Sequence, residues 1–193
     1  MKRFFMALTI FLAISAQGEA VPFSREQVDR IFIDIEAAES NSTLNLNVAT
    51  LKDNFNAIIT KILQQTMETN DVSAMEHLFL INDKDSKTFN KPDGDIFANI
   101  FGDYRVALVG AGVPNGNFKI LKLYYTTPEE KDESIFTIWL LTAFVKSFSP
   151  EIDVQALMNE LTAENSSGTV IKDKIKFSIA ADGNLNVLTA TAQ

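Results

Sequence analysis

The chain has 193 residues, no cysteine, one histidine and a net charge of −8 at neutral pH. The absence of thiols excludes disulfide bonds and thiolate metal sites, and the 46% hydrophobic content favours one domain stabilised by its core. The acidic balance disfavours binding to DNA, RNA and anionic membranes, because their phosphates repel an excess of carboxylates.

The first part of the chain has the order of a secretory signal peptide. Lys2 and Arg3 precede an apolar stretch over residues 4–15, and small residues follow it up to Ala20. The stretch has about a dozen residues whereas a membrane span needs roughly 20, so we expect cleavage after Ala20 rather than a retained anchor. Cleavage removes two basic side chains and one acidic one, which leaves 15 basic and 24 acidic side chains and a net charge of −9.

Two amphipathic helices are predicted at the start of the mature chain. Ser24 and Gln27 have the spacing of a capping box and predict a helix start. Apolar residues then recur every three or four positions over residues 28–35, although the isoleucines also alternate as they would in a strand. After a polar loop, helical spacing returns over residues 48–67 and predicts a second helix.

The pattern then changes to short apolar runs separated by turn residues, which is typical of an antiparallel meander. The runs cover residues 75–81, 96–101, 104–110 and 118–125. The turn signals are residues 90–94, from Asn90 to the Asp-Gly pair at Asp93, and residues 114–117, with the Asn-Gly pair at Asn115. Asp-Gly and Asn-Gly tolerate positive φ and favour tight turns between runs. Hairpins are therefore expected in this region.

A helix of the interior is predicted next. Thr127 has the position of an N-cap and Pro128 that of the first helical residue, and the helix is expected to continue to about residue 148. Residues 135–145 are apolar on nearly all sides, and a helix without a polar face is buried. We therefore expect this helix in the centre of the core.

A fourth helix and two strands complete the chain. Pro150 separates the third helix from the fourth, whose apolar residues have the spacing of one inward face. These residues are Val154, Leu157, Met158 and Leu161. Runs over residues 170–180 and 185–191, with a turn at Gly183 between them, predict the two strands.

The expected order of the elements, ααβββββααββ, counts one strand more in its first block than the four apolar runs, and it predicts the fold class. Helices and strands come in blocks, which favours an α+β fold with a mainly antiparallel sheet, two pairs of helices packed on it, and a single core. The blocks at residues 24–126 and 127–193 can be described as a pseudo-repeat, although no residue motif recurs between them. We therefore expect one continuous sheet in a domain of residues 21–193.

One residue is a candidate for acid–base catalysis. His77 is the only histidine, and Asp83 or Asp85 could act as its carboxylate partner. On a strand, His77 would share its face with apolar neighbours and point into the core, so packing explains it equally. No Gly-x-Ser-x-Gly motif supplies a nucleophile, and we expect a protein that is not an enzyme.

Asp83 and Asp85 are also candidate metal ligands, because they begin a stretch that resembles a calcium loop. Lys87 and Thr88 occupy positions where that loop needs an oxygen ligand and a glycine. An acidic, solvated turn explains the same residues. We therefore expect neither a metal nor another cofactor.

Aromatic residues of the third helix are candidates to bind a small apolar ligand. Trp139, Phe136 and Phe144 could line a cavity between helices and sheet. Ordinary core packing of inward helix faces explains the same residues. A carrier or sensor of such a ligand is therefore an alternative function.

The sequence thus predicts an exported, acidic, cysteine-free protein of the bacterial periplasm or exterior. Non-catalytic binding to an unknown protein or polymer is its leading function, because no catalytic motif is complete in the sequence. The alternatives are the apolar-ligand carrier and a hydrolase built on His77 and carboxylates. We expect no nucleic-acid partner and, after signal cleavage, no integral membrane segment.

Overall fold

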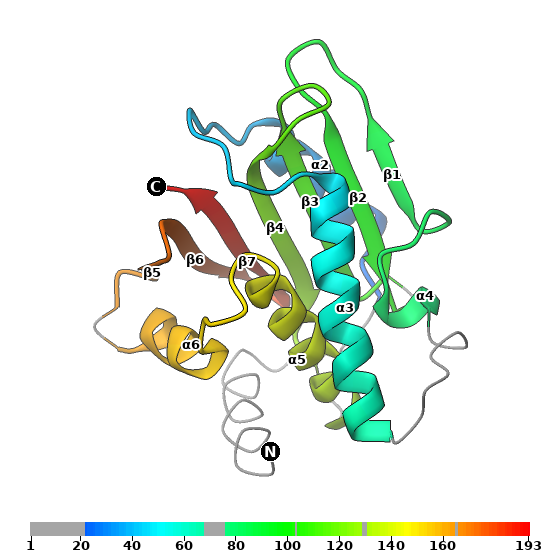
Figure 1. The fold of residues 1–193 in the computed structure, drawn as a ribbon, viewed down its shortest axis with the longest axis vertical. Helices are drawn as coiled ribbons and strands as arrows, with labels where there is room; N and C mark the ends of the chain where they lie inside the picture. Colours follow the sequence, from blue (N-terminus) through cyan, green and yellow to red (C-terminus); the bar gives the residue numbers. More distant parts are fainter. Residues whose placement is uncertain (1–21, 68–75, 103, 129–130, 165) are drawn as a thin grey trace.

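The computed structural model describes residues 22–67, 76–102, 104–128, 131–164 and 166–193 (Figure 1). The helices are α2 (Arg25–Glu36), α3 (Val48–Met67), α4 (Glu76–Phe79), α5 (Lys131–Lys146) and α6 (Val154–Thr162). The strands are β1 (Ser86–Phe89), β2 (Ile96–Phe101), β3 (Val106–Gly112), β4 (Phe118–Thr126), β5 (Thr169–Lys172), β6 (Ile175–Asp182) and β7 (Leu185–Ala192). Among these residues no helix has both the length and the apolar character to cross a membrane.

All seven of these strands form one antiparallel sheet in the order β1-β2-β3-β4-β7-β6-β5. The first four strands are a meander, and the last three are a second meander whose final strand pairs with β4. The chain crosses between the two meanders through α5 and α6. The predicted α+β class with an antiparallel sheet is confirmed.

Helices α3, α5 and α6 cover one face of the sheet, in front of it in Figure 1. Phe55 of α3 stacks on Phe101 of β2 with ring centroids 5.5 Å apart, and both side chains are fully buried. Helix α5 is buried from Ile138 to Val145, which confirms it as the core helix. The four inward residues predicted for α6 are its buried residues.

Helix α2 lies on the opposite face, behind the sheet in Figure 1. Its N-cap is Ser24, and both hydrogen bonds of the capping box with Gln27 are present. Ile31 and Ile35 are buried against the sheet while Ile33 is 66% exposed. The helical interpretation of this segment is therefore confirmed and the strand-like alternation of its isoleucines is wrong.

The buried hydrophobic side chains form two clusters rather than the expected single core. The larger cluster lies under α3, α5 and α6, and the smaller one lies under α2. Successive residues of β3 contribute to different clusters, Val106 and Leu108 to the larger and Ala107 and Val109 to the smaller. Because side chains of a strand alternate between faces, a sheet with helices on both sides separates two cores. The helices are thus not two equivalent pairs.

The predicted strand at residues 75–81 is wrong, because residues 76–79 form α4. The side chain of Asn56 on α3 explains why the chain does not pair with the sheet at Ile81. Asn56 Nδ2 donates to the Ile81 carbonyl at 2.9 Å, and the Ile81 N–H donates to Asn56 Oδ1 at 2.8 Å. Both backbone groups that a strand would use are therefore occupied.

Pro128, the predicted first helical residue, lies outside the helix, and α5 is described from Lys131 onward. The predicted cap at Thr127 depends on residues 129 and 130, which lie outside the described residues, so it stays a prediction. Thr127 also binds the turn between β6 and β7. Its N–H donates to the Asn184 carbonyl at 2.8 Å, and Asn186 Nδ2 donates to its Oγ1 at 2.9 Å. The hydroxyl that was predicted to cap the helix thus joins two distant parts of the sheet.

The run at residues 170–180 contains two strands, β5 and β6, instead of one. Asp173 and Lys174 separate them with φ of 50° and 65°. Two consecutive positive φ angles are typical of the type I′ turn that joins paired strands. The chain therefore ends with three strands, which corrects the predicted order to αααββββααβββ.

Candidate functional site

The side chain of His77 lies outside the described residues. Its backbone belongs to α4, a helix rather than the predicted strand. The hypothesis that His77 acts as a general base with Asp83 or Asp85 therefore stays a prediction.

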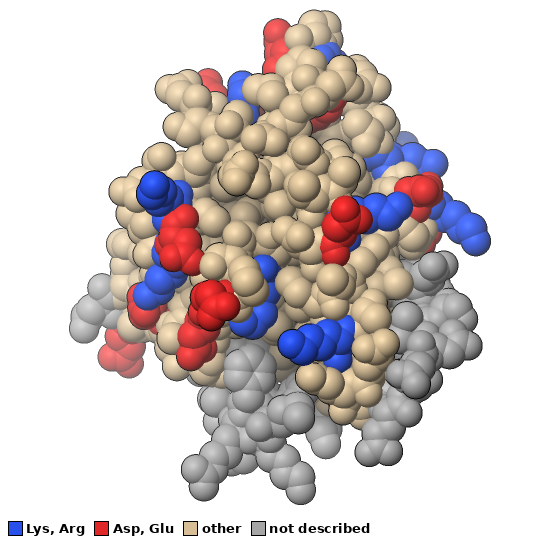
Figure 2. Space-filling view, viewed as in Figure 1, with Lys and Arg blue, Asp and Glu red and all other residues tan. Residues whose placement is uncertain are grey.

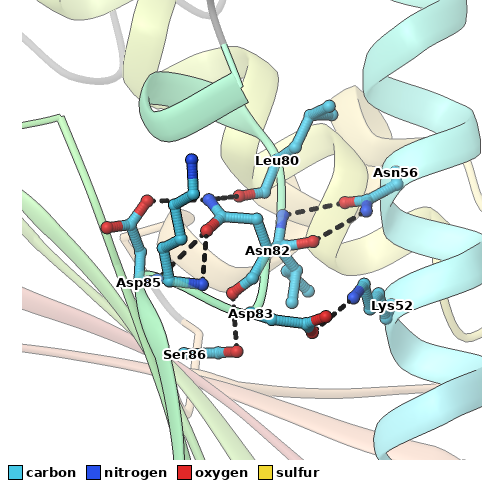
Figure 3. Close-up of polar contacts among 9 residues, drawn as sticks. Lys52, Asn56, Leu80, Asn82, Asp83, Asp85 and Ser86 are labelled. Carbon is cyan, nitrogen blue, oxygen red and sulfur yellow. Dashed lines mark hydrogen bonds and ion pairs between the residues drawn. The ribbon is translucent and has the colours of Figure 1, made fainter. Parts of the chain in front are cut away.

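Asp83 and Asp85 lie in the turn that leads from α4 to β1 (Figure 3). Asp83 forms an ion pair with Lys52 of α3, with 2.7 Å between Nζ and Oδ1. Asp85 accepts a hydrogen bond from Asn82 Nδ2 at 2.7 Å, and Asn82 Oδ1 accepts from the N–H groups of Lys84 and Asp85. Each carboxylate thus has a different structural partner. Within the described ranges, no group of three or more His, Cys, Asp or Glu side chains could hold a metal ion.

The three aromatic candidates of α5 pack against other rings. Trp139 and Phe136 both contact Phe79, with ring centroids 5.4 Å and 5.0 Å apart. Phe144 is fully buried and contacts Phe148 edge-on at 5.3 Å. The three surface hollows described below are lined by other residues. Core packing therefore accounts for these rings, and the apolar-ligand carrier stays a prediction.

A hollow of about 350 Å³ lies where the turns of the two N-terminal hairpins meet the start of α3. Parts of residues 47–49, 88–97 and 112–118 line it, and we call it the hairpin groove. Figure 2 shows mostly uncharged surface around the amino-terminal end of α3, with charged side chains at the margins of this area. The groove is thus a polar but largely uncharged feature.

The linker between α2 and α3 forms one wall of the hairpin groove because it pairs with the start of β4. The Leu44 N–H donates to the Phe118 carbonyl at 2.7 Å, and the Phe118 N–H donates to the Leu46 carbonyl at 2.8 Å. Leu44 and Leu46 are both buried. These contacts fix Asn47 at the groove.

Asn47 caps α3 and still has unused hydrogen-bond donors. Its Oδ1 accepts from the Thr50 N–H at 3.0 Å, and its own N–H donates to Thr50 Oγ1 at 2.9 Å. Its Nδ2 has no partner among the described residues. The N–H groups of Val48 and Ala49 are also unpartnered there, as expected in the first turn of a helix. The start of α3 therefore presents several free donors to the groove.

Asp95 joins the two hairpins at the opposite wall. Its Oδ1 accepts from Asn90 Nδ2 at 2.9 Å, and its Oδ2 accepts from the Asn115 N–H at 2.7 Å. These two hydrogen bonds, that from Asn115 first, lower the pKa of Asp95 below its ordinary value of 3.8. Asp95 is the one titratable side chain that lines the groove, and both of its oxygens are engaged.

The floor of the hairpin groove is made by Phe97 and Phe118, whose ring centroids are 6.1 Å apart. Each ring is only 2% exposed. Above them, Thr88 Oγ1 and Asn90 Oδ1 are acceptors without a partner in the described part of the chain. The groove therefore offers free uncharged donors at the start of α3, a free acceptor at Asn90 and a hydroxyl at Thr88 that can donate or accept.

Two other hollows occur in the described structure. One of about 490 Å³ lies on the α2 side of the same end of the sheet, where Lys91 and Glu36 form an ion pair. The other is lined by residues of α2 alone. Glu39, Asp93 and Lys119 also line the first of these hollows, and four of the five residues that line the second are charged. Both hollows are therefore more strongly charged than the hairpin groove, where Asp95 is the charged lining residue.

A polar cluster attaches α2 to the sheet. Tyr124 O–H donates to Asp34 Oδ2 at 3.4 Å, and Lys122 Nζ lies 4.0 Å from the same oxygen. Burial, followed by the charge of Asp34, raises the pKa of Tyr124. These side chains are partners of one another, so their role is explained by the packing of α2.

Comparison of the chain with protein-family models, curated proteins and solved structures finds no match. Function is therefore argued from the site itself. Sequence reasoning identified Asn90 and Asn115 as turn residues and did not assign Asn47 any role. Their positions are 25 or more residues apart in the printed chain, and no local pattern indicates that they meet.

One buried polar side chain outside the groove leads to a stability prediction. Asn99 of β2 is fully buried, and both its Oδ1 and Nδ2 lack a hydrogen-bond partner. A buried amide without partners costs about 1–3 kcal/mol. Asn99→Leu, which has similar volume, is therefore expected to raise the free energy of unfolding in urea by about 1–2 kcal/mol.

The matched control is Asn186→Leu, because Asn186 is also buried but its Nδ2 donates to Thr127. This variant is expected to lose about 1–2 kcal/mol, since it leaves Thr127 without its donor. A loss of stability in Asn99→Leu as large as that of the control would contradict the unpartnered state of Asn99.

Proposed function

We propose that the protein is an exported, non-catalytic binding module of the bacterial envelope or exterior, and that the hairpin groove is its binding site. The observation that supports this proposal is the set of free, uncharged donors and acceptors at Asn47, Thr88 and Asn90. Such groups orient a polar ligand and carry no catalytic function by themselves.

The lining of the groove argues against catalysis at this place. General acid–base catalysis needs a group whose pKa lies near the working pH. Asp95 has a lowered pKa and two hydrogen-bond donors on its carboxylate. The other lining residues carry amides, hydroxyls, apolar groups or no side chain beyond hydrogen. The groove thus favours binding over hydrolysis.

Export is the second part of the proposal, and it predicts a mature chain that begins at Val21. Phe23 is buried, and its N–H donates to the Tyr104 carbonyl at 2.7 Å. A cut after Ala20 therefore leaves the first anchor of the chain intact. Expression in a bacterial host with cell fractionation, followed by intact mass and N-terminal sequencing, tests it. Uncleaved protein confined to the cytoplasm would contradict export.

Binding is tested by cosedimentation of the mature protein with the envelope fraction of the source cells. Ala49 is an exposed residue of α3 that lines the groove, and Ala49→Trp places a large ring there. We expect this substitution to weaken binding at least tenfold. The matched control is Ala57→Trp, because Ala57 is exposed on the same helix away from the groove. Equal binding of the two variants, or no binding of the wild type, would contradict the proposal.

The pH dependence of this binding follows from Asp95. A carboxylate with a lowered pKa contributes its stabilising contacts above its ordinary pKa and loses them only as the pH falls through the lowered value. Since that value is below 3.8, the groove keeps its charge state from about pH 5 to about pH 8. The dissociation constant is expected to stay within about twofold over this interval in the cosedimentation assay. A bell-shaped profile centred there would indicate a titrating group in the site.

A further inference from the structure

We infer that the hairpin groove takes a neutral, hydroxyl-rich ligand, namely a short segment of an uncharged glycan. This inference rests on the proposed function and specifies its ligand. The hydrogen-bonding groups of the groove, its charge and the shape of its floor support a ligand of this kind.

The free groups of the groove match hydroxyls, which donate and accept at once. Asn47 supplies two N–H donors through Nδ2, and the first turn of α3 adds the N–H groups of Val48 and Ala49. Thr88 and Asn90 supply acceptors on the other wall. A ring that carries several hydroxyls can use both walls at the same time, because each hydroxyl both donates and accepts.

Charge selects against an anionic ligand. The amino-terminal end of a helix attracts anions, but the Asp95 carboxylate lines the same groove and no Lys, Arg or His does. The mature chain also has a net charge of −9. Sulfate, phosphate and uronate groups are therefore repelled, and a neutral ligand uses the free N–H groups without this penalty.

The floor selects against a peptide held by its side chains. Peptide and protein partners are usually anchored by apolar or aromatic side chains that insert into a desolvated pocket. Phe97 and Phe118 fill the floor and are packed against each other, so no deep apolar pocket lies beneath the polar rim. The volume of about 350 Å³ is at the small end of ligand sites. A shallow polar groove of this size fits a few sugar units.

The direct test is native affinity electrophoresis of the mature protein in gels that contain amylose, hydroxyethyl cellulose, glycol chitin or dextran, with polygalacturonate as the anionic polymer. We expect at least one neutral polymer to retard the wild type and polygalacturonate to leave it unretarded. Asn47→Ser keeps a side-chain oxygen for the cap and removes the Nδ2 donors, and it is expected to weaken retardation at least fivefold. The control is Asn45→Ser, because Asn45 is exposed nearby and does not line the groove.

A second measurement separates this inference from the proposed function. Envelope fractions are treated with periodate, which cleaves vicinal diols, or with protease, before cosedimentation. Binding that survives protease and is lost after periodate supports a glycan. Binding that survives periodate and is lost after protease overturns the glycan inference and leaves the binding module standing. No binding to untreated envelopes contradicts the proposed function, and a polygalacturonate preference overturns the neutral ligand.

Discussion

Replacing Phe55 with alanine is expected to lower the free energy of unfolding by about 3–5 kcal/mol, the range for a fully buried phenylalanine. Phe55 is 0% exposed and stacks on Phe101, so it joins α3 to β2. The transition midpoint in urea, followed by circular dichroism, measures the effect. The substitution is expected to leave a cavity because the ring is fully enclosed in the core and stacks on Phe101.

The control is Phe89→Ala, since Phe89 is 46% exposed on the edge strand β1. Among the described residues, its ring has one aromatic contact, a T-shaped contact with Phe32 at 5.8 Å between centroids, and a loss below about 1 kcal/mol is expected. Similar losses in the two variants would show that α3 is not held by this stack. The packing of α3 on the sheet would then depend on its other buried side chains.

Gly94→Ala is expected to lower the free energy of unfolding by about 3 kcal/mol, from backbone strain and overpacking together. Gly94 has a φ of 146°, and a Cβ at this position would lie 2.1 Å from the carbonyl oxygen of Gly112. That oxygen belongs to the backbone at the end of β3, where the Gly112 N–H donates to the Asp95 carbonyl at 2.9 Å, so it cannot rotate away. The substitution must push the two hairpins apart.

The control for this prediction is Gly183→Ala. Gly183 also has a positive φ, 61°, but a Cβ there meets no atom within 4 Å. Gly183→Ala is therefore expected to lower the free energy of unfolding only by the cost of holding alanine in the left-handed conformation, about 1–2 kcal/mol. Thermal unfolding of both variants measures the difference. We also expect Gly94→Ala to weaken ligand binding, because Asp95 follows it directly and joins the two turns. Equal melting temperatures of the two variants would contradict the close approach of the hairpins.

The elements that sequence reasoning predicted well are those with strong local signals. The capping box at Ser24 determined the start of α2, and the four apolar residues of α6 determined its buried face. The run at residues 96–101 has the same bounds as β2. In each case neighbouring residues contain the whole signal, either a helical spacing with a cap or an apolar run between turn residues.

The elements that were predicted wrongly depend on distant partners. The chain at Ile81 does not join the sheet because Asn56, on another helix, occupies its backbone groups. Thr127 is bound to the β6–β7 turn through its N–H and its hydroxyl, and no residue near it in sequence indicates these contacts. The turn at Asp173 has no glycine to mark it. Local propensity cannot report such competition between tertiary and local hydrogen bonds.

The hairpin groove could not be predicted from sequence for a similar reason. Its polar residues, Asn47, Asn90 and Asn115, each have a complete local explanation as a cap or a turn residue. Their common site arises only because the linker before α3 pairs with β4 and because Asp95 joins the two turns. The fold class and the absence of thiols are the parts that the chain itself indicates, and the export signal stays a prediction.

The central claim is that the hairpin groove is the binding site, and a ¹H–¹⁵N correlation spectrum of the mature protein tests it most directly. The protein is titrated with the neutral polymer that retards it in the gel or, if none does, with solubilised envelope. The account predicts shifts concentrated in residues 47–50, 88–90 and 112–118, including the side-chain amides of Asn47 and Asn90. Shifts confined to other surfaces, such as the exposed residues Ile171 and Ala180 of β5 and β6, would contradict it, as would a spectrum that does not change.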